Sequence, residues 1–225
     1  RDVERSRGLG DVYKRQCLSR EEIGYLLDAP DCSQPEGRRD AALLWFLYNT
    51  GARAQEVVDV HIPAIRFSAH AQVRLLGKGR KERLCPLWPE TIERLRHMLR
   101  DRQADEKADE PLFLNAAGRP LTRFGVHFIV RRCVGVAAAS YPDLARKVIS
   151  PHTFRHTTAL HLLQSGVELN VVRSWLGHAS IDTTHAYVEI DMDMKRAALA
   201  ATTPQETHGQ PSWRQPDILT WLEAL

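Results

Sequence analysis

Residues 150–187 read SPHTFRHTTALHLLQSGVELNVVRSWLGHASIDTTHAY and place histidine, arginine and tyrosine side chains beside helix signals. Ser150 and Pro151 are typical of the N-cap and first position of a helix. His152 and Arg155 stand three residues apart at this helix start, so they share one face. A helix N-terminus also presents free N–H groups, which favour an anion as the ligand. The stretch predicts an anion-binding helix start; a capped surface helix with incidental His and Arg is the alternative.

Two further helix signals follow Gly166, which is expected to end the first helix. Residues 170–175 predict a short helix, and His178 lies at its end. Tyr187 comes nine residues later, in a segment with its own helix cap. A tyrosine at an amphipathic position usually packs in a core with its hydroxyl hydrogen-bonded. The polar run at residues 182–185 leaves open the alternative that the Tyr187 hydroxyl is exposed and reactive.

The spacing of His152 and His156, four residues apart, raises the question of a metal site. The zinc-protease pattern needs a Glu beside the first His, and Thr153 stands there instead. A cation such as Arg155 beside the site would also oppose Zn²⁺. The sequence therefore disfavours a metal ion at this helix start.

Arg53 follows a helix predicted over residues 38–49, which Gly51 ends by supplying a positive φ. An arginine at that place could hold two phosphate oxygens through its planar guanidinium. The alternative is an ordinary surface pair with Glu56, three residues further on. Taken alone, this segment favours the surface pair.

Three short strands are expected at residues 64–68, 72–76 and 83–87, the last two joined by the turn GKGRKE. Lys78 lies at the tip of that hairpin between two glycines, which let a loop approach another backbone closely. It could reach a phosphate or donate a proton; a solvated turn is the alternative. The strands predict a small antiparallel sheet. Because most other segments predict helices, the expected fold class is α+β, mainly α.

Composition bounds the class of protein. The chain has 225 residues, 43% hydrophobic content and a net charge of +3, which suits one large domain or two small ones. Residues 77–83 are strongly basic, a feature that fits nucleic-acid binding without proving it. Four scattered cysteines form no CxxC pair, so we expect free thiols. No apolar run approaches the ~18 residues of a membrane span, and no signal peptide is recognisable, so we expect a cytoplasmic protein without a membrane partner.

The order of the chemical signals is more specific than any one of them. The stretches TGARAQE, GKGRKE, HTFRH, LGH and DTTHAY carry an arginine, a hairpin lysine, HxxR, GH and a tyrosine. In this order they resemble the catalytic domain of the tyrosine recombinase (phage integrase) family. The resemblance covers residues 18 to about 201 and departs at Ala52 and Ala54, where relatives often carry bulkier or hydroxyl residues. It implies a helical core on which the three-stranded sheet packs.

The resemblance implies a site-specific recombinase or integrase that cleaves a DNA strand by tyrosine attack on a phosphodiester. The products are a 3′-phosphotyrosyl linkage and a free 5′-hydroxyl, and the 5′-hydroxyl of a partner strand then rejoins the DNA. The covalent intermediate conserves the bond energy, so no cofactor, metal or ATP is implied. The implied site residues are Arg53 and Arg155 on the non-bridging phosphate oxygens, Lys78 as the acid for the leaving 5′-oxygen, His152 in proton transfer with the tyrosine, His178 on a phosphate oxygen, and Tyr187 as the nucleophile.

The implied partner is double-stranded DNA carrying a recombination site, bound by a homo-tetramer on synapsed DNA, with a monomer allowed in free solution. Glu56 is expected to support the fold by tethering its neighbours. Two other functions stay open. One is a truncated DNA-binding or regulatory module without recombination activity, and the other is type IB topoisomerase-like nicking and closing.

Three regions are expected along the chain. Residues 1–16 end in GLGDVYKRQ, which looks like translated adapter sequence, so we expect them to be non-native or else a disordered basic arm. Residues 17–201 are the expected catalytic domain. Residues 202–225 are expected to be a linker and an amphipathic segment that docks in cis or on a neighbouring copy. Relatives carry an N-terminal core-binding domain, so we expect the chain to be a fragment without it.

Overall fold

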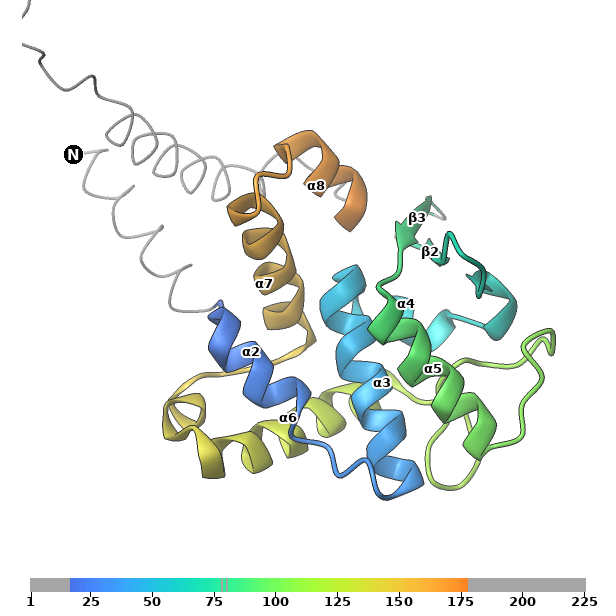
Figure 1. Ribbon diagram of the computed structural model, residues 1–225, viewed down its shortest axis with the longest axis horizontal. Coiled ribbons are helices and arrows are strands. Elements are labelled where there is room, and N and C mark those ends of the chain that lie inside the picture. The colour runs from blue at the N-terminus through green and yellow to red at the C-terminus, as the bar shows by residue number, and fades with distance from the viewer. Residues whose placement is uncertain (1–16, 78, 80, 178–225) are drawn as a thin grey trace, which may run out of the picture. The chain divides into compact units, whose positions relative to one another are not determined.

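The computed structural model describes residues 17–77, 79 and 81–177 (Figure 1). Its helices are α2 (Arg20–Leu27), α3 (Pro35–Thr50), α4 (Ala54–Asp59), α5 (Pro89–Asp101), α6 (Arg123–Ser140), α7 (Pro151–Gln164) and α8 (Leu169–Leu176). The strands are β1 (Ile65–Arg66), β2 (Gln72–Leu76) and β3 (Glu82–Pro86), and two short 3-10 helices are η1 (Ile62–Ala64) and η3 (Pro142–Arg146). The predicted class, α+β and mainly α, is confirmed.

Helix α3 is the centre of the helical core. It packs against α2, α5 and α7 (Figure 1). Its apolar stripe, which includes Leu43, Phe46 and Leu47, is fully buried. Burying each large apolar side chain stabilises the fold by roughly 1.5–3 kcal/mol. The helix begins at Pro35, a residue suited to the first turn, and therefore starts earlier than predicted; Gly51 follows it with φ +58°, as predicted.

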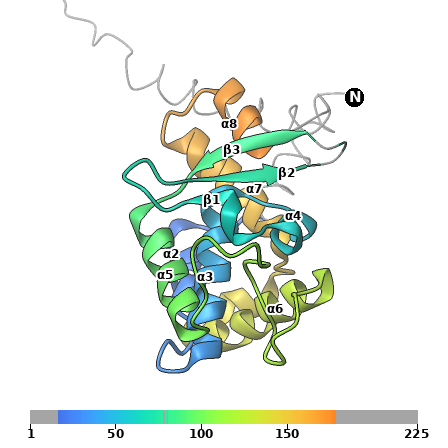
Figure 2. The same ribbon diagram turned by 90° about the vertical axis from the view of Figure 1, so that its right-hand side faces the viewer.

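The three strands form one antiparallel sheet in the order β1-β2-β3 at one end of the helical core (Figure 2). Val73 of β2 pairs with Cys85 of β3, and alternate residues of both strands are buried. The predicted bounds of β2 are confirmed, and β3 is shifted by one residue. The extent predicted for the first strand, residues 64–68, is wrong: β1 is only Ile65–Arg66, because the chain winds into η1 before it and enters a bend and turn at residues 68–70 after it.

Helix α6 corrects another prediction. Residues 137–147 were expected to be irregular, but α6 continues to Ser140 and η3 follows it. Residues 137–139 are three consecutive alanines, and alanine has the most favourable helix propensity. Pro142, which has no backbone N–H, comes only after the helix has ended. Helix α6 therefore extends into the segment that was expected to be irregular and ends two residues before Pro142.

Helices α7 and α8 hold the described part of residues 150–187. Ser150 is the N-cap of α7, where its backbone N–H donates to Thr153 Oγ1 (3.1 Å), and Pro151 is the first helical residue. Helix α8 is one residue longer at each end than predicted and ends at Gly177 with φ +64°. Residues 1–16 and 178–225, with the helices and linker predicted there, lie outside the described residues.

All four cysteines are free thiols, as predicted, and Cys17, Cys85 and Cys133 are buried. Burial raises the pKa of Cys17 to about 11 and that of Cys133 to about 12. These thiols therefore stay protonated at neutral pH and are poor nucleophiles. Within the described ranges, no helix combines the length and apolar character that a membrane crossing requires.

Candidate functional site

The structure describes three of the six predicted site residues: Arg53, His152 and Arg155. The positions of Lys78, His178 and Tyr187 fall outside the described residues, so their places in the site stay predictions. The three described side chains come from two segments that lie about 100 residues apart in the sequence. The fold brings them together at the start of α7.

Arg155 is a buried cation that joins three helices. Only 4% of the residue is exposed. From near the start of α7, its Nη1 donates to the Gly51 carbonyl oxygen at the end of α3 (2.8 Å), and its Nη2 donates to the Leu176 carbonyl oxygen at the end of α8 (2.6 Å). Carbonyl groups at a helix C-terminus carry partial negative charge, so a guanidinium suits both places. The folded backbone therefore fixes the position of this guanidinium.

Arg53 is held at the N-cap of α4 by Glu56. Its backbone N–H donates to Glu56 Oε2 (2.8 Å), and its Nη1 donates to Glu56 Oε1 (2.9 Å). The ion pair between Arg53 and Glu56, which the sequence offered as an alternative to a phosphate-binding role, is therefore present. The pair does not bury the arginine, because 33% of its side chain stays exposed. Glu56 thus orients the Arg53 guanidinium at a surface that an anion from solvent can reach.

Glu56 also forms a buried ion pair with Arg83 of β3. Arg83 Nη1 donates to Oε1 (2.9 Å) and Nη2 donates to Oε2 (2.7 Å), which is a bidentate arrangement. Burial alone would raise the pKa of Glu56, but the hydrogen bonds and charge of Arg83, with the hydrogen bonds of Arg53, outweigh it and lower the pKa. Glu56 is therefore an anion that holds two guanidiniums, and its predicted tethering role is confirmed.

The sequence places Arg83 in a basic segment and at the start of a predicted strand, but it predicted no partner for this residue and no role in the site. The available signal was strand alternation: Arg83 shares the buried face of β3 with Cys85. A charged side chain on a buried strand face needs a buried partner, since an unpaired charge there is costly. That argument predicts an acidic partner for Arg83 but does not say which one.

His152 lies in the same electrostatic neighbourhood as both arginines. Partial burial lowers its pKa, and the charge of Arg155, then His127 of α6, then Arg53, lowers it further. A lowered pKa keeps the imidazole neutral at neutral pH, where it can accept a proton. Arg53 and Arg155 are therefore close enough to His152 to influence its charge, and so is His127 of α6, which sequence reasoning did not single out.

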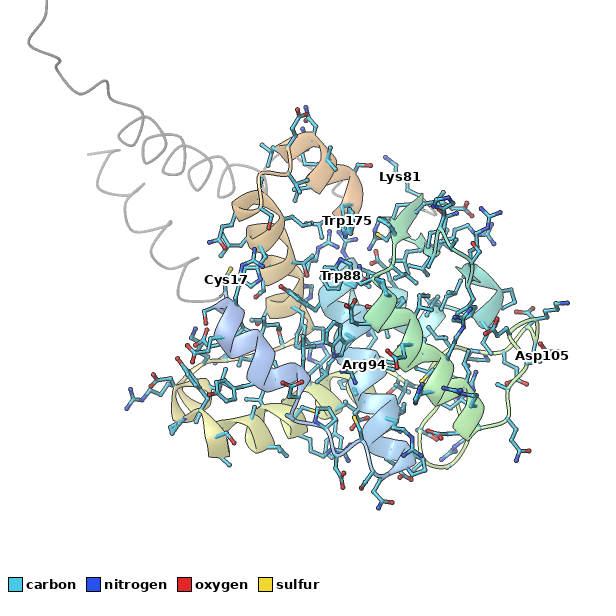
Figure 3. The ribbon with its side chains drawn as sticks, viewed as in Figure 1. Cys17, Lys81, Trp88, Arg94, Asp105 and Trp175 are labelled. Carbon is cyan, nitrogen blue, oxygen red and sulfur yellow. The ribbon has the colours of Figure 1, made fainter. Side chains whose placement is uncertain are left out.

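The end of α8, just before His178, is fastened to α3 and β3. Trp175 lies between the ends of α8 and α3 (Figure 3), and its Nε1 donates to the Asn49 carbonyl oxygen (3.1 Å). Arg83 Nε donates to the Trp175 carbonyl oxygen (2.9 Å). Helix α8 therefore ends beside Arg155, next to the network that holds Arg53.

This arrangement suits a phosphate. Two guanidiniums, a neutral imidazole and a helix N-terminus supply hydrogen-bond donors and positive charge to one place. In the described part of the chain, no three His, Cys, Asp or Glu side chains are grouped so that they could hold a metal ion. The described residues can therefore bind an anion and accept a proton. The positive charge that attracts the anion is that of the Arg53 and Arg155 guanidiniums.

Comparison with protein families matches residues 16–194 to the phage integrase family. The integrase/recombinase y4rC of Sinorhizobium fredii is 39% identical over 210 residues, which cover 92% of this chain and 62% of that protein. Tyrosine recombinase XerD of Chlorobaculum tepidum is 39% identical over 188 residues, which cover 80% of this chain and 59% of that protein. The chain thus spans about three fifths of the length of these relatives.

Solved structures agree with these matches. The structure of XerH site-specific recombinase bound to a palindromic difH substrate, in a post-cleavage complex, is similar to this fold with a TM-score of 0.68 at 28% identity. The similarity covers 81% of this chain and 52% of that one.

Proposed function

This chain belongs to the phage integrase family, as a tyrosine recombinase catalytic domain, and we propose from that premise that it cleaves and rejoins DNA strands at a specific site through a covalent intermediate on Tyr187. The observation that carries the proposal is the shared position of Arg53, Arg155 and His152 at the start of α7. Together they form a site for one phosphate group.

In the proposed cleavage step, Tyr187 Oη attacks the phosphorus, and the bond from phosphorus to the 5′-oxygen breaks. Neutral His152 takes the tyrosine proton, and Lys78 gives a proton to the leaving 5′-oxygen. Arg53 and Arg155 hold the non-bridging oxygens and offset charge as the pentacoordinate phosphorus forms. His178 donates to a phosphate oxygen. A 5′-hydroxyl then attacks the phosphotyrosyl bond in the reverse sense and rejoins the DNA.

The same proposal covers cofactors and assembly. The guanidiniums supply the charge that a divalent metal would otherwise supply, and the phosphotyrosyl bond retains the energy of the phosphodiester, so neither metal nor ATP is needed. The partner is double-stranded DNA in a cytoplasmic compartment, bound by four copies of the chain on synapsed sites, with a monomer allowed in free solution.

Covalent capture tests the proposal without knowledge of the target site. The protein is incubated with a pool of randomised DNA duplexes, each with a nick placed so that cleavage releases a short strand and traps the covalent complex. An SDS-resistant protein–DNA adduct is expected for the native chain, with EDTA present or absent, and none for Tyr187→Phe. Tyr25→Phe, which changes an exposed tyrosine, is the matched control and should keep the adduct.

A folded native chain that forms no adduct, or an adduct that persists in Tyr187→Phe, would contradict the proposal. The captured duplexes then separate the related activities. Transfer of the cleaved strand to a second duplex supports recombination, and relaxation of supercoiled DNA without transfer supports nicking and closing. Binding without cleavage supports a regulatory module.

A further inference from the structure

We propose that Arg83 is a positioning residue, which sets the Lys78 turn and the His178 segment relative to Arg53 and Arg155. This inference rests on the proposed function, since Lys78 and His178 are catalytic only within it. Arg83 itself is buried and does not contact the DNA in this proposal.

The guanidinium of Arg83 connects three separate elements. The side chain comes from β3, its two Nη atoms donate to Glu56 of α4, and its Nε donates to the Trp175 carbonyl oxygen at the end of α8. The pKa of Arg83 is raised, because the hydrogen bonds and charge of Glu56 outweigh the opposing effect of burial. It therefore remains a cation, and its planar fork fixes all three elements at once.

Two glycines lie against this fork. A Cβ placed on Gly77 would lie 3.4 Å from Glu56 Oε1 and 3.8 Å from Arg83 Nη1. A Cβ placed on Gly177 would lie 3.1 Å from Arg83 Cδ. Because Gly77 directly precedes Lys78 and Gly177 directly precedes His178, the backbone that leads into both predicted catalytic residues lies beside the ion pair of Arg83 and Glu56.

The backbone pairing of the hairpin continues up to the turn that Arg83 adjoins. Gly77 N–H donates to the Lys81 carbonyl oxygen (2.8 Å), and Leu76 pairs with Glu82 immediately below the turn. Cys85, two residues beyond Arg83 on the same face, also places its Sγ 3.3 Å from the Trp175 carbonyl oxygen. A shift of Arg83 would therefore displace the hairpin and the end of α8 together, since both are fastened through it.

Arg83→Gln tests the role in the adduct assay, on a duplex captured by the native chain. A displacement of about 1 Å can lower the rate constant of a positioned reaction about 100-fold, and we expect a loss of that size. The affinity for the duplex should stay within about threefold, because all three guanidinium nitrogens of Arg83 donate to Glu56 and the Trp175 carbonyl oxygen and none is assigned to a phosphate. Arg83→Lys keeps the charge beside Glu56 but cannot make all three contacts, so it should restore only part of the rate.

Arg74→Gln is the matched control. Arg74 lies on β2 of the same hairpin and is well exposed, and its Nη1 lies 3.7 Å from Glu82 Oε1, which is also exposed. It should keep the native rate. A rate loss in Arg74→Gln equal to that in Arg83→Gln would overturn the inference, because any change of charge in the hairpin would then suffice.

A sulfur substitution separates positioning from a general loss of structure. A duplex with sulfur in place of the 5′-bridging oxygen releases a thiolate, which leaves without the proton that Lys78 supplies. If Arg83 acts partly by placing Lys78, the defect of Arg83→Gln should shrink on this duplex. A defect that stays the same size, together with a general loss of stability, would overturn the positioning role.

Hydrogen exchange tests the inference without DNA. In Arg83→Gln, the backbone amides of residues 77–81 and 176–177 should exchange faster, while those of α3 stay protected. Native exchange at both segments would overturn the inference. The readouts also separate the two proposals: absence of an adduct from the native chain counts against the proposed function, whereas native exchange in Arg83→Gln counts against the positioning role alone.

Discussion

At the scale of single residues, Arg155 differs from Arg53 in having the backbone as its partner. Lysine at this position keeps the charge but lacks the planar fork that reaches both Gly51 and Leu176. We expect Arg155→Lys to lower the free energy of unfolding by about 1–3 kcal/mol, since a buried carbonyl is left unpaired. We also expect the rate of adduct formation to fall about 100-fold.

Urea denaturation measures the change in stability, and the covalent capture assay measures the rate. Arg146→Lys is the control, because Arg146 is exposed and pairs with exposed Asp143. Its free energy of unfolding should change by less than about 0.5 kcal/mol. Equal changes in the two variants would contradict the structural role given to Arg155.

Glu56 carries a second prediction at this scale. Glu56→Gln keeps the shape of the side chain but leaves the buried Arg83 cation without a counter-charge, so the free energy of unfolding should fall by about 3 kcal/mol. Because the fold lowers the pKa of Glu56, its stabilising effect is present above the ordinary carboxyl pKa and is lost as pH falls through the folded value. The difference between native and variant should therefore shrink in acid.

Urea unfolding at about pH 7 and about pH 3, on either side of the ordinary pKa of a carboxyl group, measures this difference. Glu82→Gln removes an exposed carboxylate from the same hairpin and should cost less than about 0.5 kcal/mol. A difference between native and Glu56→Gln that is as large in acid as at neutral pH would argue against the charge as its source.

At the scale of elements, the sequence located helix ends better than it located the contacts between elements. The sequence identifies Gly51 and Ser150 because caps and positive-φ glycines act on immediate neighbours. It does not identify Arg83, because the partner carbonyl of Arg83 at Trp175 lies 92 residues away in the sequence. The sequence identified the three described site residues through their motifs, but the network that brings them together leaves no local pattern.

A pair of glycines tests how the element ends are packed. Gly51 ends α3 with φ +58°, and a Cβ there would lie 2.5 Å from Leu176 Cδ2. Gly166, after α7, has φ +82° and nothing within 4 Å of such a Cβ. Gly166→Ala should cost about 1 kcal/mol through the left-handed backbone alone. Gly51→Ala should cost about 1–3 kcal/mol more, since it also displaces the end of α8.

Urea unfolding of both variants gives the comparison. Gly51→Ala should also slow adduct formation, because Leu176 supplies a carbonyl partner of Arg155. Gly166→Ala should leave the rate at the native value. If the two alanine variants lost the same stability, the close contact between the ends of α3 and α8 would not be a determinant of the fold.

At the scale of the whole molecule, the fold holds three histidines of α7 neutral. Burial is the largest cause that lowers the pKa of His152, His156 and His161, and nearby positive groups add to it. The unfolded chain regains the ordinary pKa of 6.5 and binds more protons than the native fold just below that pH. These groups stabilise the fold above pH 6.5, and their contribution is lost as pH falls through the lower folded pKa values.

His161 allows this dependence to be assigned, because it lies six residues beyond Arg155 along α7 and is not one of the predicted site residues. It is buried, and its Nδ1 lies 2.8 Å from the Tyr48 hydroxyl. His161→Gln keeps a polar group beside Tyr48 but cannot titrate, so its free energy of unfolding should fall less steeply than that of the native chain as pH is lowered. Urea unfolding at intervals from about pH 8 to about pH 5, which brackets the ordinary histidine pKa, measures both slopes. His97→Gln, at an exposed position on α5, should keep the native slope. If the free energy of unfolding depended on pH equally in the native chain and in His161→Gln, groups other than His161 would cause the loss of stability in acid.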